Sequence, residues 1–239
     1  MITREQIECL NSELEGKSPQ EILRRAVDSF GASGCALASS FGAEDQVITD
    51  IIHSENLQVP LFTLDTGRLH QETYNVLDAT RLRYGLQIEV LFPERGAVET
   101  MVTSHGPNLF YESVERRREC CGVRKIEPLK RKLSTLTAWI CGLRREQSVT
   151  RTAVAPIEWD AAFGLYKINP LAEATEEWVW EYIKEHSVPY NALHDEGFPS
   201  IGCAPCTRAV KPGEDVRAGR WWWEMAEHRE CGLHRGEKQ

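Results

Sequence analysis

Short apolar runs alternate with segments of helical periodicity along most of the chain. Helical patterns follow the first two runs, one ending near His53 and the other near Tyr84. A short apolar run bounded by turn signals is typical of a buried parallel strand. Alternating strands and helices predict an α/β fold with a doubly wound, mainly parallel sheet, in which ligands bind at the carboxyl ends of the strands. The apolar runs cover residues 35–39, 59–64, 87–92 and 139–142.

The two ends of the chain differ from this alternating part. The N-terminal end predicts two amphipathic helices, the second with Ser18 as its cap and Pro19 at its first position. The C-terminal end is rich in loop-forming residues and carries charged and aromatic clusters. We expect a single domain over residues 1–239, divided into N-terminal helices (1–30), an α/β core (31–190) and a C-terminal segment (191–239) that ends in a mobile tail.

Composition and charge narrow the class of protein. The 239 residues are 41% hydrophobic and 27% charged, as in folded globular proteins, and the net charge is −8. Non-specific nucleic-acid binding requires a basic face, so we expect no nucleic-acid partner. The apolar runs are too short for a membrane span, and the first ten residues contain no apolar signal core. These features predict a cytoplasmic enzyme with no membrane association.

Basic residues occur in small clusters along this acidic chain. Each cluster, taken alone, is typical of a solvated helix face. Arg144 and Arg145 differ because they follow the predicted strand at 139–142, where ligands of such sheets bind. Any anionic ligand would have to use this local positive charge. The clusters are Arg116–Arg118, Arg124 with Lys125, Arg144 with Arg145 and Arg151, and Arg208 with Lys211, Arg217 and Arg220.

Eight cysteines are present, and without a secretory signal we expect reduced thiols. Cys203 and Cys206 have the two-residue spacing that can direct two thiolates to one soft metal, although a redox dithiol has the same spacing. Cys120 and Cys121 supply a second pair. Four thiolates fit either zinc or an iron–sulfur cluster, and adjacent cysteines favour the cluster because each can reach a different iron. Burial of Cys120 and Cys121 without a metal is the alternative.

The remaining cysteines fall into two kinds. Cys231 lies near the end of the chain in the sequence Glu-Cys-Gly-Leu-His, where an accessible thiol suits a nucleophile better than a ligand. A surface thiol without function is the alternative interpretation. Cys9, Cys35 and Cys141 stand singly in apolar or amphipathic surroundings and are expected to serve in packing.

The turn after the first predicted strand could bind an anion. Residues 39–45 read Ser-Ser-Phe-Gly-Ala-Glu-Asp, with two hydroxyls and a glycine at the start of a helix. The turn lacks the lysine of a triphosphate-binding loop and the glycine pattern of a dinucleotide fingerprint. An ordinary strand-to-helix turn with a serine cap would look similar.

Several motifs, taken in order, resemble one known family. These motifs are the turn at 39–45, the sequence Leu-Asp-Thr-Gly at 64–67, the sequence Cys-Cys-Gly-Val-Arg-Lys at 120–125 and the C-terminal sequence around Cys231. Together they resemble the assimilatory adenylyl-sulfate and phosphoadenylyl-sulfate reductases, which have a fold of the adenine nucleotide α-hydrolase type. The resemblance extends over nearly the whole chain. The branch of this family with both cysteine pairs holds a [4Fe-4S] cluster and prefers adenosine 5′-phosphosulfate (APS).

This resemblance implies a role for each matching residue. It makes Cys231 the catalytic thiol, and it makes Cys120, Cys121, Cys203 and Cys206 the ligands of a [4Fe-4S] cluster. The residues that it assigns to substrate are Ser39, Ser40, Gly42, Leu64, Lys125, Gly142, Arg151, Arg217 and Arg220.

The resemblance also implies a reaction and a partner. The Cys231 thiolate would attack the sulfur of APS, release AMP and leave an enzyme S-sulfocysteine. Thioredoxin or a glutaredoxin-like protein would then release sulfite, a step of assimilatory sulfate reduction and cysteine biosynthesis. The sequence leaves open a homo-oligomeric state.

Three other functions compete with this interpretation. The nearest is reduction of 3′-phosphoadenylyl sulfate (PAPS), or of both nucleotides. An ATP pyrophosphatase would share the fold but would need a glycine-richer turn than the one at 39–45. A zinc-binding interaction module would use the same four cysteines without catalysis.

Overall fold

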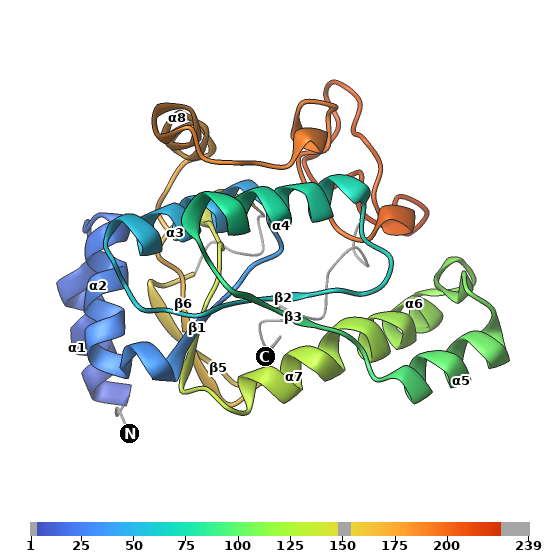
Figure 1. The fold of residues 1–239 in the computed structure, drawn as a ribbon, viewed down its shortest axis with the longest axis horizontal. Coiled ribbons are helices and arrows are strands. Elements are labelled where there is room, and N and C mark those ends of the chain that lie inside the picture. The colour runs from blue at the N-terminus through green and yellow to red at the C-terminus, as the bar shows by residue number, and fades with distance from the viewer. Residues whose placement is uncertain (1–3, 148–153, 226–239) are drawn as a thin grey trace.

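The computed structural model describes residues 4–147 and 154–225 and contains one mixed sheet (Figure 1). The strand order is β3-β2-β1-β4-β6-β5, and only the β5–β6 pair is antiparallel within this sheet. The predicted doubly wound, mainly parallel α/β sheet is therefore confirmed. The strands are β1 (Cys35–Ala38), β2 (Leu61–Leu64), β3 (Ile88–Leu91), β4 (Ala138–Ile140), β5 (Ile157–Asp160) and β6 (Leu165–Ile168).

The sequence pattern did not reveal β5 and β6, because charged residues interrupt both strands. Lys167 of β6 is nevertheless buried, and its Nζ lies 2.9 Å from Asp160 Oδ2 and 3.5 Å from Glu158 Oε1 on β5. The same ammonium lies 5.3 Å from the centre of the Trp139 ring. These contacts, made only after folding, offset the cost of burying the charges.

Helices surround the sheet, with α3 and α4 over one face and α7 on the other side (Figure 1). Helix α6, a π-helical turn at Gly122–Ile126 and α7 follow one another without a break. No helix within residues 4–147 and 154–225 has the length and apolar character needed to cross a membrane. The helices are α1 (Arg4–Leu14), α2 (Pro19–Phe30), α3 (Ala43–Ser54), α4 (Gln71–Tyr84), α5 (Arg95–His105), α6 (Val114–Cys121), α7 (Glu127–Leu133) and α8 (Glu176–His186).

The start of α2 is as the sequence predicts. Ser18 caps the helix by accepting a hydrogen bond from the Glu21 amide, and the Glu21 carboxylate accepts one from the Ser18 amide at 2.9 Å. Pro19 occupies the first turn, where its missing N–H costs nothing. The apolar side of this helix, including Leu23 and Ala26, is fully buried against the core.

A buried carboxylate joins three helices on the α3 side of the sheet. Asp50 on α3 accepts a hydrogen bond from Tyr84 of α4 at 2.8 Å and another from Tyr182 of α8 at 2.9 Å. Both oxygens of the carboxylate are thereby satisfied. Burial and the bond to Asp50 raise the pKa of both tyrosines, so they remain donors across the physiological range.

We expect Tyr182→Phe to destabilise the fold by about 1.5–3 kcal/mol, because it leaves one oxygen of a buried carboxylate without its donor. Urea unfolding measures this change. Tyr190→Phe is the matched control, since Tyr190 also donates to a carboxylate, Asp195, but on the surface. The control should lose less than about 0.5 kcal/mol. Equal losses in the two variants would contradict a special contribution from the buried site.

Candidate functional site

A pocket opens at the carboxyl ends of β1, β2 and β4 and encloses a cavity of ≈ 300 Å³. This is the edge at which parallel α/β sheets bind ligands. The pocket draws its walls from the sheet, from α8 and from the segment after residue 190. Arg151, also assigned to substrate from the sequence, lies outside the described residues. The other residues so assigned all line this pocket: Ser39, Ser40, Gly42, Leu64, Lys125, Gly142, Arg217 and Arg220.

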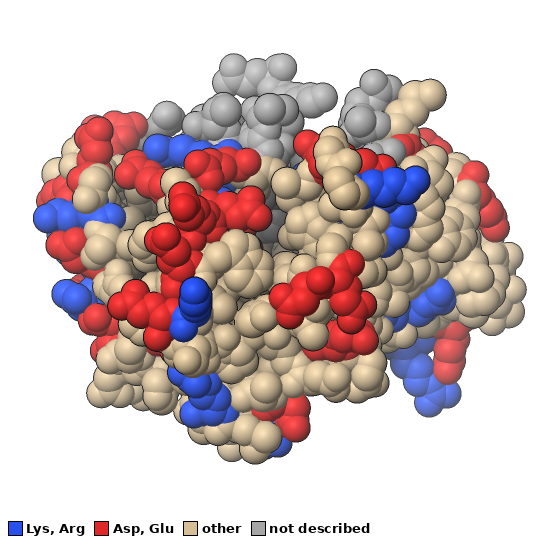
Figure 2. Space-filling view, turned by 90° about the horizontal axis from the view of Figure 1, so that it is seen from above, with Lys and Arg blue, Asp and Glu red and all other residues tan. Residues whose placement is uncertain are grey.

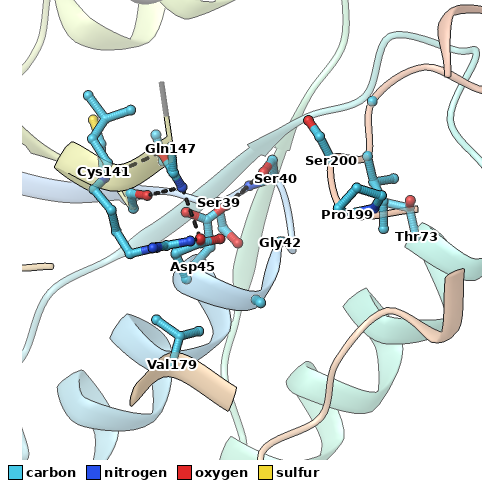
Figure 3. Close-up of a pocket in the computed structure, with 18 of the residues that line it drawn as sticks. Ser39, Ser40, Gly42, Asp45, Thr73, Cys141, Gln147, Val179, Pro199 and Ser200 are labelled. Atoms are coloured by element: carbon cyan, nitrogen blue, oxygen red, sulfur yellow. Dashed lines mark hydrogen bonds and ion pairs between the residues drawn. The ribbon is translucent and has the colours of Figure 1, made fainter. Parts of the chain in front are cut away.

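The turn after β1 is held by its own side chains (Figure 3). Asp45 Oδ2 accepts hydrogen bonds from the Ser40 amide and the Ser40 hydroxyl, each at 2.7 Å. Ser39 Oγ accepts from the Phe41 amide at 3.1 Å. Phe41 is only 1% exposed and has a left-handed φ of 60°, which is rare for a bulky residue and is typical of functional turns. The Ser40 donors therefore organise the turn around Asp45.

Two kinds of hydrogen-bond donor at this turn could serve an anionic ligand: a serine hydroxyl and the backbone amides at the start of α3. The Ser39 hydroxyl accepts from Phe41, so its own proton is available to a ligand. Helix α3 begins after Gly42, which supplies no side-chain cap for the first-turn amides. An uncapped helix N-terminus suits an anionic oxygen. Burial raises the pKa of Asp45 to about 6, and the hydrogen bonds from Ser40 oppose that rise.

Gly142 at the end of β4 lies directly against the turn. A Cβ atom at this position would stand 2.6 Å from Asp45 Oδ1 and 2.8 Å from Glu44 Cβ. Any other residue would push the start of α3 away from the sheet. The glycine is required by the close approach of two chain segments, which also brings its backbone to the pocket wall.

Positive charge enters the pocket from two sides. Lys125 comes from the π-helical turn, and Arg217 and Arg220 come from the C-terminal segment. On the described part of the face shown in Figure 2, Lys and Arg side chains stand among Asp and Glu side chains. The pocket lining also contains acidic side chains, so the attraction for an anion is local to these three cations. The acidic residues are Glu44, Asp45, Glu146 and Glu176.

Sequence reasoning missed the pairing of Arg144 inside the pocket. This arginine is 5% exposed, and its Nε donates to Glu44 Oε1 at 2.8 Å. Gln147 donates to the same oxygen at 2.9 Å and to the carbonyl of Gly142 at 3.2 Å (Figure 3). The position of Arg144 after β4 was the available signal. Its charge is committed to Glu44, so it braces the pocket wall.

Two further pocket residues were not identified from the sequence. Trp180 of α8 lines the pocket and meets the His194 ring edge-to-face at 5.1 Å. Burial lowers the pKa of His194, so its imidazole is neutral near pH 7. One packing prediction was wrong, because Cys9 is exposed, whereas Cys35 and Cys141 are buried as expected.

The two cysteine pairs meet beside the pocket. Cys120, Cys203 and Cys206 pack in one apolar cluster together with Trp221. Burial, followed by the neighbouring thiols Cys203, Cys121 and Cys120, raises the pKa of Cys206 to about 12. In the described ranges, no three His, Cys, Asp or Glu side chains converge on a single ion position. Four cysteine thiolates are a donor set that suits either a zinc ion or an iron–sulfur cluster.

Local hydrogen bonds hold the cysteine-bearing segments. Thr66 Oγ1 lies 3.2 Å from Cys203 Sγ, and the Ala204 amide donates to the Arg68 carbonyl at 2.8 Å. Arg124, within the π-helical turn, donates to the Thr66 carbonyl at 2.6 Å. The turn after β2 therefore contacts both cysteine segments. Cys231, the fifth cysteine of the predicted site, lies outside the described residues.

The chain is similar to known proteins over most of its length. Residues 34–209 match the phosphoadenosine phosphosulfate reductase domain. A protein of Allochromatium vinosum named adenosine 5′-phosphosulfate reductase is 56% identical over 200 residues, covering 84% of this chain and 78% of the relative. The protein of that name from Pseudomonas aeruginosa is 51% identical over 235 residues, covering 95% and 86%.

Solved structures show the same fold. The phosphoadenylyl-sulfate reductase of Candida auris, in a phosphate complex, is 30% identical with a TM-score of 0.76, covering 88% of this chain and 98% of that one. The FMN adenylyltransferase of Candida glabrata, at 17% identity, 90% and 72% coverage and a TM-score of 0.57, shares the fold alone. The extent and identity of these matches show that the chain belongs to the family of phosphoadenylyl-sulfate and adenylyl-sulfate reductases.

Proposed function

We propose that the chain reduces APS to sulfite and AMP, with thioredoxin or a glutaredoxin-like protein as the reductant. The observation that carries the proposal is the meeting of two cysteine pairs beside a pocket lined by Lys125, Arg217 and Arg220 at one end of the sheet. The relatives with the highest identity reported above bear the name of this activity. Reduced thiols are stable in the cytoplasm, where we place the reaction.

The four paired cysteines are proposed to hold a [4Fe-4S] cluster. Cys120 and Cys121 would bind it from the end of α6, and Cys203 and Cys206 from the C-terminal segment. When bound, the cluster would cross-link these segments and contribute its charge to the field near Lys125. Because residues of the core and of the C-terminal segment line one pocket, we also propose that residues 1–239 act as one domain.

The proposed chemistry is carried by thiols. The Cys231 thiolate attacks the sulfur of APS, a new S–S bond forms, and the S–O bond of the anhydride breaks with its electron pair leaving on AMP. Lys125, Arg217 and Arg220 hold the phosphosulfate oxygens and stabilise the departing negative charge. A thiolate of the partner then attacks Cys231 Sγ and expels sulfite. The partner's second thiol closes its own disulfide and returns Cys231 reduced.

Turnover of the two sulfonucleotides with reduced thioredoxin tests the proposal. We expect kcat/KM for APS to exceed that for PAPS by at least about tenfold, a difference of about 1.4 kcal/mol in transition-state binding. A preference for PAPS would favour the second candidate, PAPS reduction, which is the activity named for the Candida auris structure. Turnover of neither nucleotide would reject both.

The substitution Gly202→Ala should weaken substrate binding without unfolding the protein. A Cβ at Gly202 would overlap the guanidinium of Arg220, the far end of a long side chain, so we expect the arginine to be displaced before the backbone moves. We expect kcat/KM for APS to fall about ten- to hundredfold through loss of charge-assisted hydrogen bonds. Steady-state kinetics and thermal unfolding measure the two effects.

Gly96→Ala is the matched control for this substitution. Gly96 lies in α5, and an added Cβ there meets no atom within 4 Å. This control should keep its activity and its stability. A Gly202→Ala protein with unchanged kinetics would remove Arg220 from the binding of substrate.

A further inference from the structure

Arg117 belongs to a run of three arginines that predicts a solvated helix face, yet its side chain is 1% exposed. Its Nε donates to Glu224 Oε1 at 2.9 Å and its Nη2 donates to Oε2 at 2.8 Å. The Glu224 side chain is 3% exposed. Two parallel charge-assisted bonds of this kind fix the relative orientation of both groups. The pair therefore ties α6 to the last described part of the chain.

Trp221 completes this contact. Two guanidinium groups contact its ring, with Arg117 at 4.6 Å and Arg220 at 4.8 Å from the ring centre. The backbone of Trp221 has a left-handed φ of 43°, and its amide donates to the Cys206 carbonyl at 3.1 Å. A tryptophan keeps this uncommon conformation only where its surroundings enforce it. The turn at 221–224 is thus held from the helix and from the cysteine segment at once.

A buried ion pair is a poor source of stability, because the loss of hydration cancels most of the attraction. A buried ion pair can instead select one arrangement of the chain segments that carry it, since any other arrangement would leave a buried charge without its partner. The arrangement here joins described parts of the site to the segment of sequence that precedes Cys231. Arg117 lies three residues before Cys120, Arg220 lines the pocket, and Glu224 lies seven residues before Cys231.

We propose that Arg117, Trp221 and Glu224, which we name the anchor, form a positioning device for the Cys231 thiol. The anchor fixes the point from which the chain continues toward Cys231, relative to the pocket and to the cysteine pairs. Seven residues span at most about 25 Å, so the location of Glu224 limits where the thiol can react. This proposal rests on the proposed function, in which Cys231 is the nucleophile.

If the anchor positions the thiol, its loss should affect the rate of the reaction and the affinity for nucleotide differently. Displacement of a reacting group lowers the rate of the bond-forming step and leaves affinity for the nucleotide nearly unchanged. Glu224→Gln removes the charge and keeps the shape of the side chain. We expect the single-turnover rate of adduct formation at saturating APS, followed by intact-protein mass, to fall at least about tenfold. The affinity for AMP should change less than about threefold, and iron content should stay at the wild-type value.

The matched control is Glu214→Gln, which breaks a bidentate pair with Arg208 elsewhere in the C-terminal segment. This control should react at the wild-type rate. Should Glu224→Gln lose iron or fail to fold, Glu224→Asp retains the charge with a shorter reach and should show the same difference between rate and affinity to a smaller degree.

The outcomes separate the two proposals. A wild-type protein that forms no adduct with APS would overturn the proposed function and the anchor with it. A wild-type protein that reacts, beside anchor variants that react equally fast, would overturn the anchor alone. So would variants in which the rate and the AMP affinity fall together, because that result indicates a general structural role.

Discussion

Replacing Cys231 with Ser is expected to lower APS turnover by at least about 10³-fold, because the variant lacks the only group proposed to bond to the substrate sulfur. A serine hydroxyl is far less acidic than a thiol and has no adjacent base assigned to it. Intact-protein mass after addition of APS without reductant should show a sulfonate on the wild type and none on the variant. Binding of AMP and the iron content should be unchanged.

Cys9→Ser is the matched control for this experiment, since Cys9 is an exposed free thiol. The control should form the sulfonate adduct at the wild-type rate. A sulfonate that persists in Cys231→Ser, or that maps to another cysteine, would remove Cys231 from the mechanism and leave the nucleophile to be found among the other thiols.

The sequence predicts the part of the fold in which apolar residues are contiguous. β1, β2 and β4 are nearly uninterrupted apolar runs, and they lie in the middle of the sheet where both faces are covered. β6 also lies inside the sheet, but the buried Lys167 breaks its pattern. No local rule shows that such a charge will find its carboxylate on the neighbouring strand. Strand prediction from the sequence fails where a charged residue is buried, because its partner on another strand becomes its neighbour only on folding.

The same limit applies to the site. The family resemblance assigns Ser39, Leu64 and Gly142 to substrate, and each is the last residue of a predicted strand. The ends of parallel strands meet at one edge of the sheet, and the three residues line the pocket there. The burial of Arg117 and Arg144 could not be predicted, because their partners lie 107 and 100 residues away. A run of basic residues is by itself typical of a solvated helix face, and only the folded structure shows the glutamate with which a buried arginine pairs.

Replacing Cys206 with Ser is expected to abolish iron binding as well as activity. Cys206 is 9% exposed and packs with Trp221, Met101 and Phe110. Burial raises the pKa of its thiol, so metal binding would have to displace a proton from this sulfur. A serine would leave one cluster corner without a thiolate and would bury an extra hydroxyl. Iron and acid-labile sulfide should fall well below the wild-type content, and the unfolding temperature should decrease.

Cys35→Ser separates ligation from packing in this comparison. Cys35 is also fully buried, and burial raises the pKa of its thiol to about 11, but it lies in β1 within the main core. The substitution should cost about 1–3 kcal/mol for the buried hydroxyl and leave the iron content intact. Iron retained by Cys206→Ser would contradict the cluster ligation proposed above. Stoichiometric zinc in a colourless wild-type protein would instead favour the zinc-binding module, because zinc has no visible absorption and needs only one position among the four sulfurs.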